Sequence, residues 1–165
     1  MGINILKALF HIKAAIQKVF YKLLFGTHVR FGRKTTFRKG FSLYLDDGGS
    51  ITIGDGCFFN HFCSLNALEN ISIGKNCIFG ENVKIYDHNH KFSRRDLPIK
   101  EQGFSSAPVV IGNDCWICSN VTILKGVHIG DHCVIGAGCL IVKDISANTV
   151  VKHIAQLQQE SMEER

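Results

Sequence analysis

Two histidines beside a carboxylate form the segment with the clearest capacity for chemistry, Asp87-His88-Asn89-His90. The unperturbed pKa of histidine allows its side chain to exchange a proton near neutral pH. Either His88 or His90 is therefore a candidate general base for a hydroxyl or amine nucleophile. A neighbouring carboxylate such as Asp87 can orient or polarise one of the two imidazoles. Histidines in exposed loops also occur without any function, so the case for chemistry depends on what holds this segment.

A third histidine extends the group. His61 lies in the block FFNHFCSLNA, close in the repeat to the strand expected beneath the histidine loop, and it is a candidate member of a substrate pocket. His61, His88 and His90 together would be the donors of a zinc site. Catalytic zinc needs ligands fixed on rigid elements, and H-x-H in a loop does not meet that condition. We therefore expect no metal.

An internal repeat of six residues provides the scaffold. From residue 111 onward an isoleucine returns at every sixth position without a miss, and similar blocks begin at Ile73, Ile53 and Phe31. A period of six fits neither an α-helix nor a simple alternating strand. It fits a coil in which six residues make one short strand and one turn. The chain is therefore predicted to be an all-β solenoid of parallel sheets with a continuous apolar interior. The regular positions are Ile111, Ile117, Ile123, Ile129, Ile135 and Ile141.

Six of the seven cysteines occupy one position of this repeat, four residues after its aliphatic residue. Valine stands at the equivalent position elsewhere, as at Val83, Val121 and Val127. The position therefore requires a small apolar side chain, which predicts buried free thiols rather than metal ligands. Cys118 is the exception, because it stands where glycine follows the aliphatic residue in other repeats. The six cysteines are Cys57, Cys63, Cys77, Cys115, Cys133 and Cys139.

The repeat is interrupted by the segment 86–109, which contains the two candidate histidines. Turns in a solenoid are short, and long excursions from a rigid scaffold are common places for function. We expect an N-terminal amphipathic helix over residues 1–28 and a β-helix over residues 29–150 that carries this excursion. Residues 151–165 form a tail with the composition of a short exposed helix.

The positive charge of the chain is concentrated at its N-terminal end. The first 45 residues contain nine Lys or Arg and no Asp or Glu, while the remaining 120 contain ten basic and fourteen acidic residues. The two parts therefore carry +9 and −4, which sum to the net charge of +5. This asymmetry favours an anionic neighbour such as a membrane surface or a phosphorylated substrate. Nucleic acid is not an expected partner, because no binding motif accompanies the charge.

Residues 3–25 have apolar side chains at the spacing of an amphipathic helix, with lysines between them. We expect this helix to cap the open end of the solenoid, and its basic character also allows peripheral contact with a membrane. The chain has no apolar run long enough for a transmembrane helix, and its N-terminal segment lacks a signal-peptide pattern. The expected location is the cytoplasm, with contact at the inner face of the membrane as an option.

The repeated [ILV]-G-x4 pattern, the histidine-led excursion and the run VVIGNDCWICSNVTILKGVHIGDHCVIGAGCLIVKDI resemble the hexapeptide-repeat O-acetyltransferases. The maltose, galactoside and xenobiotic acetyltransferases and the polysaccharide O-acetyltransferases are the most similar groups. The resemblance covers about residues 50–150. It implies a left-handed parallel β-helix and a homotrimer with active sites between subunits. It also implies acetyl-CoA as the acyl-donor cosubstrate and a sugar or glycan hydroxyl as the acceptor.

Carried over residue by residue, the resemblance implies a catalytic base at His90, eight positions after Asn82 of an N-V-x-[IL] strand. His88 is the second choice, because the alignment of a loop can shift by two positions. The family mechanism is direct transfer without a covalent intermediate. The histidine deprotonates the acceptor hydroxyl, the oxygen attacks the thioester carbonyl, and backbone N–H groups stabilise the oxyanion.

The same resemblance implies five positions that contact coenzyme A between adjacent subunits. Lys143 would reach a phosphate of the cosubstrate as a point charge. Trp116 is expected to pack beside the coenzyme groove or the subunit boundary. The five positions are Ser119, Ala137, Val142, Lys143 and Trp116.

The chain departs from the family pattern at its C-terminal end. Ser146 replaces a proline, and VVKHIAQLQQE replaces a segment that closes the coenzyme site, with Lys152 as a substitute cation. Cys118 replaces a glycine and places a side chain near the groove. The leading hypothesis is an acetyl-CoA-dependent O-acetyltransferase that acts on a sugar or a cell-surface polysaccharide precursor. The alternatives are a non-catalytic trimeric scaffold or degenerate family member, and a carbonic-anhydrase-like zinc enzyme.

Overall fold

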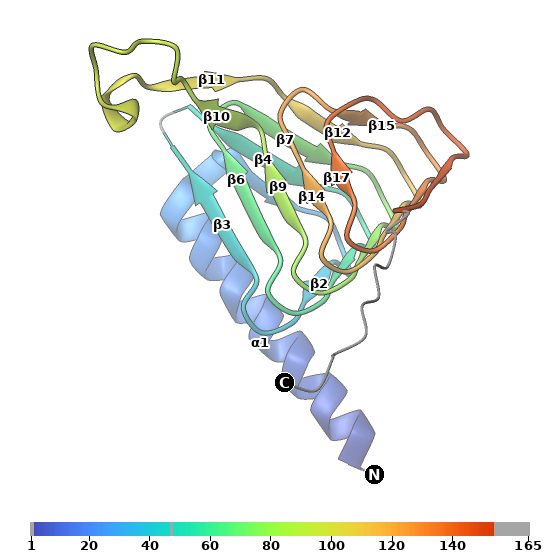
Figure 1. Ribbon diagram of the computed structural model, residues 1–165. Helices are drawn as coiled ribbons and strands as arrows, with labels where there is room; N and C mark the ends of the chain where they lie inside the picture. Colours follow the sequence, from blue (N-terminus) through green and yellow to red (C-terminus); the bar gives the residue numbers. More distant parts are fainter. Residues whose placement is uncertain (1, 47, 154–165) are drawn as a thin grey trace, which may run out of the picture.

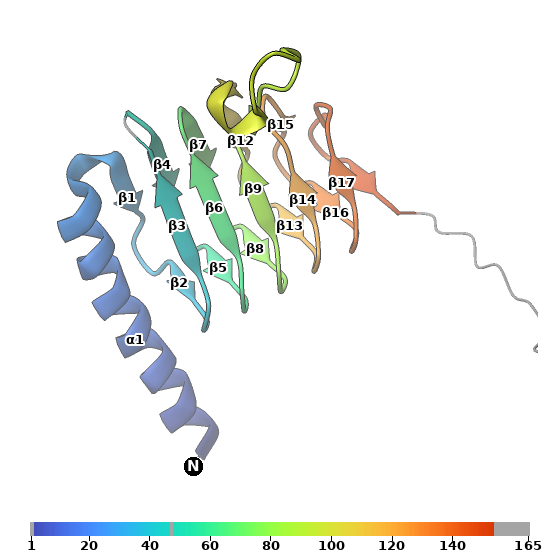
Figure 2. The ribbon, with the colours of Figure 1, turned by 60° about the vertical axis from the view of Figure 1, so that its left-hand side comes forward.

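The computed structural model describes residues 2–46 and 48–153, with side chains from residue 8 onward. The chain winds into a parallel solenoid whose coils each contain three short strands, and these strands stack into three sheets around one apolar core (Figures 1 and 2). The parallel β-solenoid and the N-terminal helix, which were predicted from the six-residue repeat and from the spacing of residues 3–25, are both confirmed.

Each of the three sheets takes one strand from each of the first five coils, and sheet B takes a sixth strand, β18, from the next coil. Sheet A contains β1 (Val29–Phe31), β4 (Ser50–Ile53), β7 (Asn70–Ile73), β12 (Val109–Ile111) and β15 (His128–Ile129). Sheet B contains β2 (Thr36–Phe37), β5 (Phe58–Phe59), β8 (Ile78–Phe79), β13 (Trp116–Ile117), β16 (Val134–Ile135) and β18 (Val150–Val151). Sheet C contains β3 (Ser42–Leu45), β6 (Ser64–Ala67), β9 (Lys84–Tyr86), β14 (Thr122–Ile123) and β17 (Leu140–Ile141).

The core consists of side chains that repeat in register from coil to coil. In sheet A, Ile111 pairs with Ile73 below it and with Ile129 above it, and all three are 2% exposed or less. In sheet B the same position holds Phe59 and Phe79, whose rings stack at a centroid distance of 4.2 Å. Every sixth residue therefore buries its side chain on identical neighbours, and this burial is the main source of stability.

The corner between sheets A and B uses one residue per coil at positive φ, a conformation that glycine, asparagine and aspartate adopt more readily than other residues. Asn76 has φ 59° and Gly56 has φ 72°. The glycine that follows the repeated isoleucine has a different cause, because the coils approach too closely for a side chain. A Cβ atom on Gly74 would lie 2.6 Å from the carbonyl oxygen of Gly112 in the next coil.

The six cysteines predicted to be buried free thiols are buried and unbridged, and Cys118, the predicted exception, is half-buried. Five of the six buried thiols, all except that of Cys139, also donate hydrogen bonds to backbone oxygens of the next coil. Cys57 Sγ lies 3.1 Å from Gly74 O, and Cys77 Sγ lies 3.1 Å from Gly112 O. The cysteine position is therefore small and apolar, and it also provides a weak donor for a carbonyl at the corner.

Helix α1 (Gly2–Phe25) covers the first coil at the N-terminal end of the solenoid (Figure 2). It is followed by the short helix η1 (Gly26–His28). Ala14 and Tyr21 are buried against the coil, and the Tyr21 hydroxyl donates to the carbonyl of Phe41 at 3.2 Å. Gln17 Nε2 donates to the same oxygen at 2.9 Å. The helix therefore supplies hydrogen-bond donors to a carbonyl of the first coil and covers an end of the solenoid that would otherwise be open.

The excursion leaves the solenoid where sheet C meets sheet A. It contains an antiparallel pair, β10 (His88–His90) and β11 (Phe104–Ser106), and the short helix η2 (Ile99–Glu101) between these strands. At the other end, β18 continues sheet B beside β16, and the predicted tail 151–165 lies outside the described residues from position 154 onward. Among the described helices, none has the length and apolar character needed to cross a bilayer.

The register of the core predicts a large effect of substitution at Ile71, which is fully buried in β7. Ile71→Ala is expected to lower the free energy of unfolding by about 2–5 kcal/mol, because it removes buried methyl groups and leaves a cavity between two coils. Urea unfolding measures this change. Ser72→Ala alters the next residue, on the opposite face of the same strand, and is the control with a change of about 0.5 kcal/mol or less. Equal effects of the two substitutions would contradict the assigned register.

Candidate functional site

A buried aspartate at the end of the third coil holds the histidine-bearing hairpin. Asp87 is completely buried, and its Oδ1 and Oδ2 accept hydrogen bonds from the backbone N–H groups of Leu68 and Glu69, both at 2.8 Å. Its own backbone oxygen accepts from the N–H of Ala107 at 2.8 Å, where the chain returns to the solenoid. Asp87 therefore connects the preceding coil to both ends of the excursion.

The side chain of His88 is fixed by this aspartate. Its Nδ1 lies 3.0 Å from Asp87 Oδ1, and the side chain of His88 is only 15% exposed. A carboxylate oxygen accepts, so Nδ1–H is the donor in this bond, and Nε2 is left for other contacts. The ring packs edge-on against Phe104 at a centroid distance of 5.3 Å and against Tyr86 at 6.3 Å. The expectation that Asp87 orients one imidazole is met at His88.

His90 has a different environment on the same strand. Its side chain is exposed, and its ring lies 4.4 Å from the ring of Phe104 across the hairpin, where the two residues are paired. The two histidines therefore share Phe104 as a neighbour. His88 is oriented and mostly covered, whereas His90 is accessible to a molecule outside the hairpin.

Six of the seven predicted site residues border sheet C. Ser119 and Ala137 lie in neighbouring coils at the corner between sheets B and C, where the N–H of Gly138 donates to Ser119 O at 3.0 Å. Val142 and Lys143 follow β17 toward the opposite corner, the one that also carries the hairpin. Trp116 lies apart from them in β13 of sheet B, half exposed and paired with Ile78 and Val134.

The corner that contains Ser119 carries an acidic side chain that sequence reasoning missed. The Ser119 hydroxyl donates to Glu81 Oε2, and Asn60 Nδ2 donates to Glu81 Oε1, both at 2.5 Å. The hydroxyl of Ser119 lowers the pKa of Glu81 below its ordinary value, and His61 in the preceding coil acts in the same direction. Alignment of the corners would have identified Glu81, because it follows Gly80 as Ser119 follows Cys118.

The structure separates His61 from the other two histidines. His61 lies in the turn between β5 and β6, at the corner between sheets B and C, whereas His88 and His90 belong to the hairpin at the other edge of sheet C. Within residues 2–46 and 48–153, no three acidic, histidine or cysteine side chains converge closely enough to hold a metal ion. Cys118 is half-buried beside Ser119, and burial raises the pKa of its thiol.

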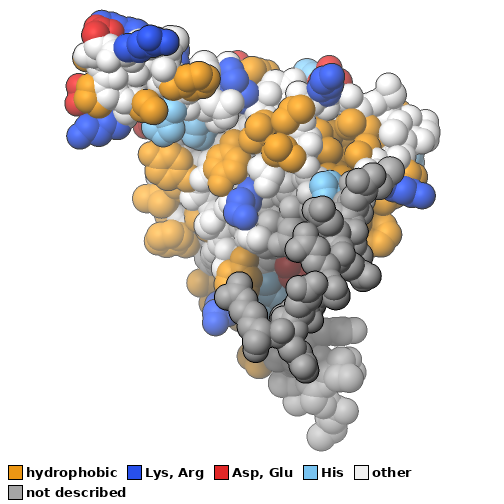
Figure 3. All heavy atoms as spheres, in the orientation of Figure 1, with side chains coloured by type: hydrophobic (Ala, Val, Ile, Leu, Met, Phe, Trp, Pro, Cys, Tyr) orange, Lys and Arg blue, Asp and Glu red, His pale blue; other side chains and the backbone are white. Residues whose placement is uncertain are grey.

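The outer surface of sheet C between these two corners carries both polar side chains, such as Lys84 and Thr122, and apolar ones. Tyr44, Leu140 and Val142 project outward from or beside sheet C with exposed fractions of 56–61%. Figure 3 shows apolar side chains gathered over β14 and β17, with histidine at the base of the excursion and both cationic and acidic side chains on the excursion itself. A ligand on this face would meet polar and apolar side chains in the middle, the Ser119 corner on one side and the histidine hairpin on the other.

Comparison with known proteins places this architecture in a family. The family model "Bacterial transferase hexapeptide (six repeats)" matches residues 108–143. The WbbJ protein of Escherichia coli K12, which carries the name of an O-acetyltransferase of lipopolysaccharide biosynthesis, is 31% identical over 130 residues. The match covers 74% of this chain and 66% of WbbJ. The chain belongs to the hexapeptide-repeat acetyltransferase family.

Two further relatives are informative, one through the activity in its name and the other through the ligand in its crystal structure. The galactoside O-acetyltransferase of Escherichia coli K12 is 35% identical over 109 residues, which are 66% of this chain and 52% of that protein. A hexapeptide-repeat acetyltransferase of Vibrio cholerae, crystallised with acetyl-coenzyme A, has a TM-score of 0.68 and 26% identity. The match covers 82% of this chain and 70% of that structure. This chain therefore spans between about half and two thirds of these curated relatives.

The contacts of Asp87 predict that the hairpin depends on its carboxylate. Asp87→Ala is expected to lower the free energy of unfolding by about 2 kcal/mol or more, because two backbone N–H groups and His88 lose their acceptor in a buried place. Hydrogen exchange at Leu68 and Glu69 should accelerate in the same variant. Asp96→Ala removes an exposed carboxylate paired with Arg94 and is the control, with little change expected. Unchanged exchange at both amides would contradict the assigned contacts.

Proposed function

We propose that this chain transfers an acetyl group from acetyl-CoA to a hydroxyl of a sugar or of a cell-surface polysaccharide precursor. The observation that carries the proposal is the exposed His90 on a hairpin that a buried carboxylate anchors to a rigid solenoid. The family and the named activities of its members supply the acetyl donor and the class of acceptor. The outer face of sheet C beside the hairpin, which carries both polar and apolar side chains, supplies a surface for both substrates.

In the proposed reaction His90 takes the proton of the acceptor hydroxyl as its oxygen attacks the thioester carbonyl. The tetrahedral intermediate collapses, the C–S bond breaks, and the coenzyme A thiolate leaves with the proton that the imidazolium returns. Backbone N–H groups are the expected donors to the oxyanion. His90 is preferred over His88 because a base must reach its substrate, and the ring of His88 is mostly covered and bonded to Asp87.

His88 and Asp87 are proposed to position the hairpin. The Asp87–His88 bond fixes one ring against Phe104, and Phe104 in turn supports the ring of His90 from the paired strand. A shift of this pair would therefore move the base relative to its substrate. Small displacements of a catalytic group are costly because the reaction requires a near-attack geometry.

A homotrimer is proposed to complete the site. Ser119 and Ala137 lie on one edge of sheet C, Lys143 lies on the other edge, and Trp116 lies on sheet B. A coenzyme that contacts all of these positions at once would need a second subunit, which matches the family's placement of active sites between subunits. Lys143 is exposed, as expected for a cation that meets a phosphate of acetyl-CoA.

Replacement of the two histidines tests the assignment of the base. His90→Ala is expected to lower kcat by about 10²–10⁴-fold while acetyl-CoA binding is retained, because the residue acts in the proton transfer. His88→Ala should lower kcat less, because His88 acts only through the position of the hairpin. The measurement is acetyl-CoA-dependent thiol release with a panel of mono- and disaccharides. Full turnover by His90→Ala with turnover lost in His88→Ala would transfer the role to His88.

Acetyl-CoA binding tests the cosubstrate without any assumption about the acceptor. Calorimetry is expected to show saturable binding to the wild-type chain, weakened about fivefold by Lys143→Ala because one exposed cation loses its phosphate partner. Lys75→Ala, at the corner between sheets A and B, is the matched control and should leave the affinity unchanged. No binding at millimolar donor would favour the non-catalytic scaffold, for which the altered sequence after Ile145 is the motivation.

A further inference from the structure

Helix α1 presents a second apolar face that the solenoid does not use. Its outward side chains are large, apolar and 57–81% exposed. At 100° per residue these positions, with Ala8 and Ala15, span an arc of roughly 140–180° on the side opposite Ala14 and Tyr21. The exposed large residues are Leu9, Ile12, Ile16, Val19, Phe20, Leu23 and Leu24.

The packing of the helix on the solenoid does not require this face. The inner side is complete without it, because Ala14 and Tyr21 are buried and Gln17 and Tyr21 bond the carbonyl of Phe41. Most of the apolar positions expected from the sequence to form the capping face therefore point outward. An exposed apolar surface of this size marks an interaction site in a stable protein.

The borders of the outward face are cationic. Lys22 lies along one border and Lys13 along the other, and both are exposed. Lys18 and Lys22 also line a cleft of about 600 Å³ between the helix and the first coil, together with Arg30, Val19 and Phe31. Partial burial in this position lowers the pKa of Lys18. A cleft with cationic and apolar walls suits an anionic group attached to an apolar chain.

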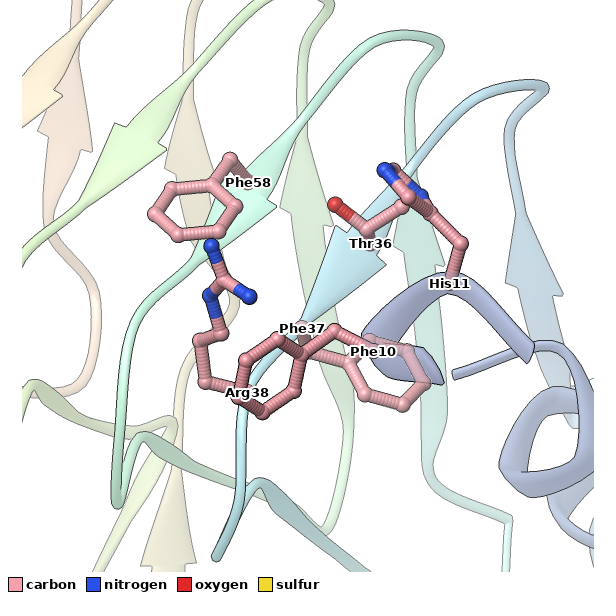
Figure 4. Close-up of a pocket in the computed structure, with 6 residues that line it drawn as sticks. All are labelled: Phe10, His11, Thr36, Phe37, Arg38 and Phe58. Carbon is pink, nitrogen blue, oxygen red and sulfur yellow. The ribbon is translucent and has the colours of Figure 1, made fainter. Parts of the chain in front are cut away.

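A further cation holds the N-terminal half of the helix in place. Arg38, which follows β2, lies with its guanidinium 4.1 Å from the ring centroid of Phe10 and 5.4 Å from that of Phe58. Figure 4 shows these side chains around a pocket between the helix and sheet B, with His11 beside Thr36. The cation–π contacts fix the orientation of the helix, so the outward face stays directed away from the solenoid.

We infer that the outward face of α1 docks on an anionic lipid bilayer, with the helix lying in the plane of the interface. The apolar side chains enter the boundary between head groups and acyl chains, while Lys13 and Lys22 meet the lipid phosphates. The charge selects this occupant over a second copy of the helix. The first 45 residues hold nine basic and no acidic side chains, so two such faces would repel each other and an anionic surface would attract both.

Vesicle sedimentation of the full chain tests this docking. Phosphatidylcholine vesicles with about one third phosphatidylglycerol should bind the protein at least about tenfold more strongly than pure phosphatidylcholine vesicles, and high salt should weaken the difference. The double variant Ile16→Glu/Leu23→Glu should lose about a hundredfold in partitioning to the anionic vesicles, because two charges enter the apolar face. Lys13→Gln/Lys22→Gln should lose about fivefold per removed charge.

The matched control replaces two apolar residues of comparable exposure, outside the helix, with glutamate. Tyr44→Glu/Ile99→Glu alters sheet C and the excursion, where both side chains are 56% exposed, and should bind vesicles like the wild type. Circular dichroism and acetyl-CoA binding of the helix variants report whether the solenoid is intact, and so separate this test from the proposed catalysis. Vesicle binding that is absent, or insensitive to the helix variants, would overturn the inference. A change in sedimentation velocity without a change in vesicle binding would assign the face to contact between chains instead, and would equally overturn it.

Discussion

The stacking of one aliphatic or aromatic side chain in every six residues is the interaction on which the other features depend. Ile111 between Ile73 and Ile129 shows its geometry, because each coil buries its residue against the same residue of the next coil. The spacing leaves no room for a side chain at Gly74 and little room beside it, where the cysteines lie. The interior is therefore filled by packing, and chemistry can only be carried by the outer faces, the corners and the excursion.

Asp87 attaches the histidine-bearing hairpin to this scaffold. It ends the third coil, binds two backbone N–H groups of the preceding coil and receives the returning chain at Ala107. The excursion is thereby fixed at its base in spite of its length. A hairpin fixed in this way can hold His90 in one position although its own strands have only three residues each.

The regular parts of the fold were predictable and the irregular parts were not. The isoleucine period predicted the solenoid and the burial of the six cysteines, because both follow from local spacing. The pairing of His90 with Phe104 was not predictable, since the register of the hairpin is set inside the excursion and outside the repeat. The sequence also left open which face of α1 packs on the solenoid, for another reason. Both of its faces are apolar, so periodicity alone could not identify Ala14 and Tyr21 as the inner side.

The coil spacing sets how far the hairpin lies from α1 along the solenoid. The helix covers the first coil and the hairpin leaves the third, and neighbouring strands of a sheet are about 4.8 Å apart. The hairpin base therefore lies only about 10 Å further along the solenoid than the coil that the helix covers. A bilayer on the outward face of α1 would lie roughly 20 Å from the hairpin base along the solenoid, because the helix itself adds about 10 Å. An acceptor whose sugar extends about this far from its lipid would reach His90 without leaving the membrane, whereas a free sugar would gain nothing from the helix.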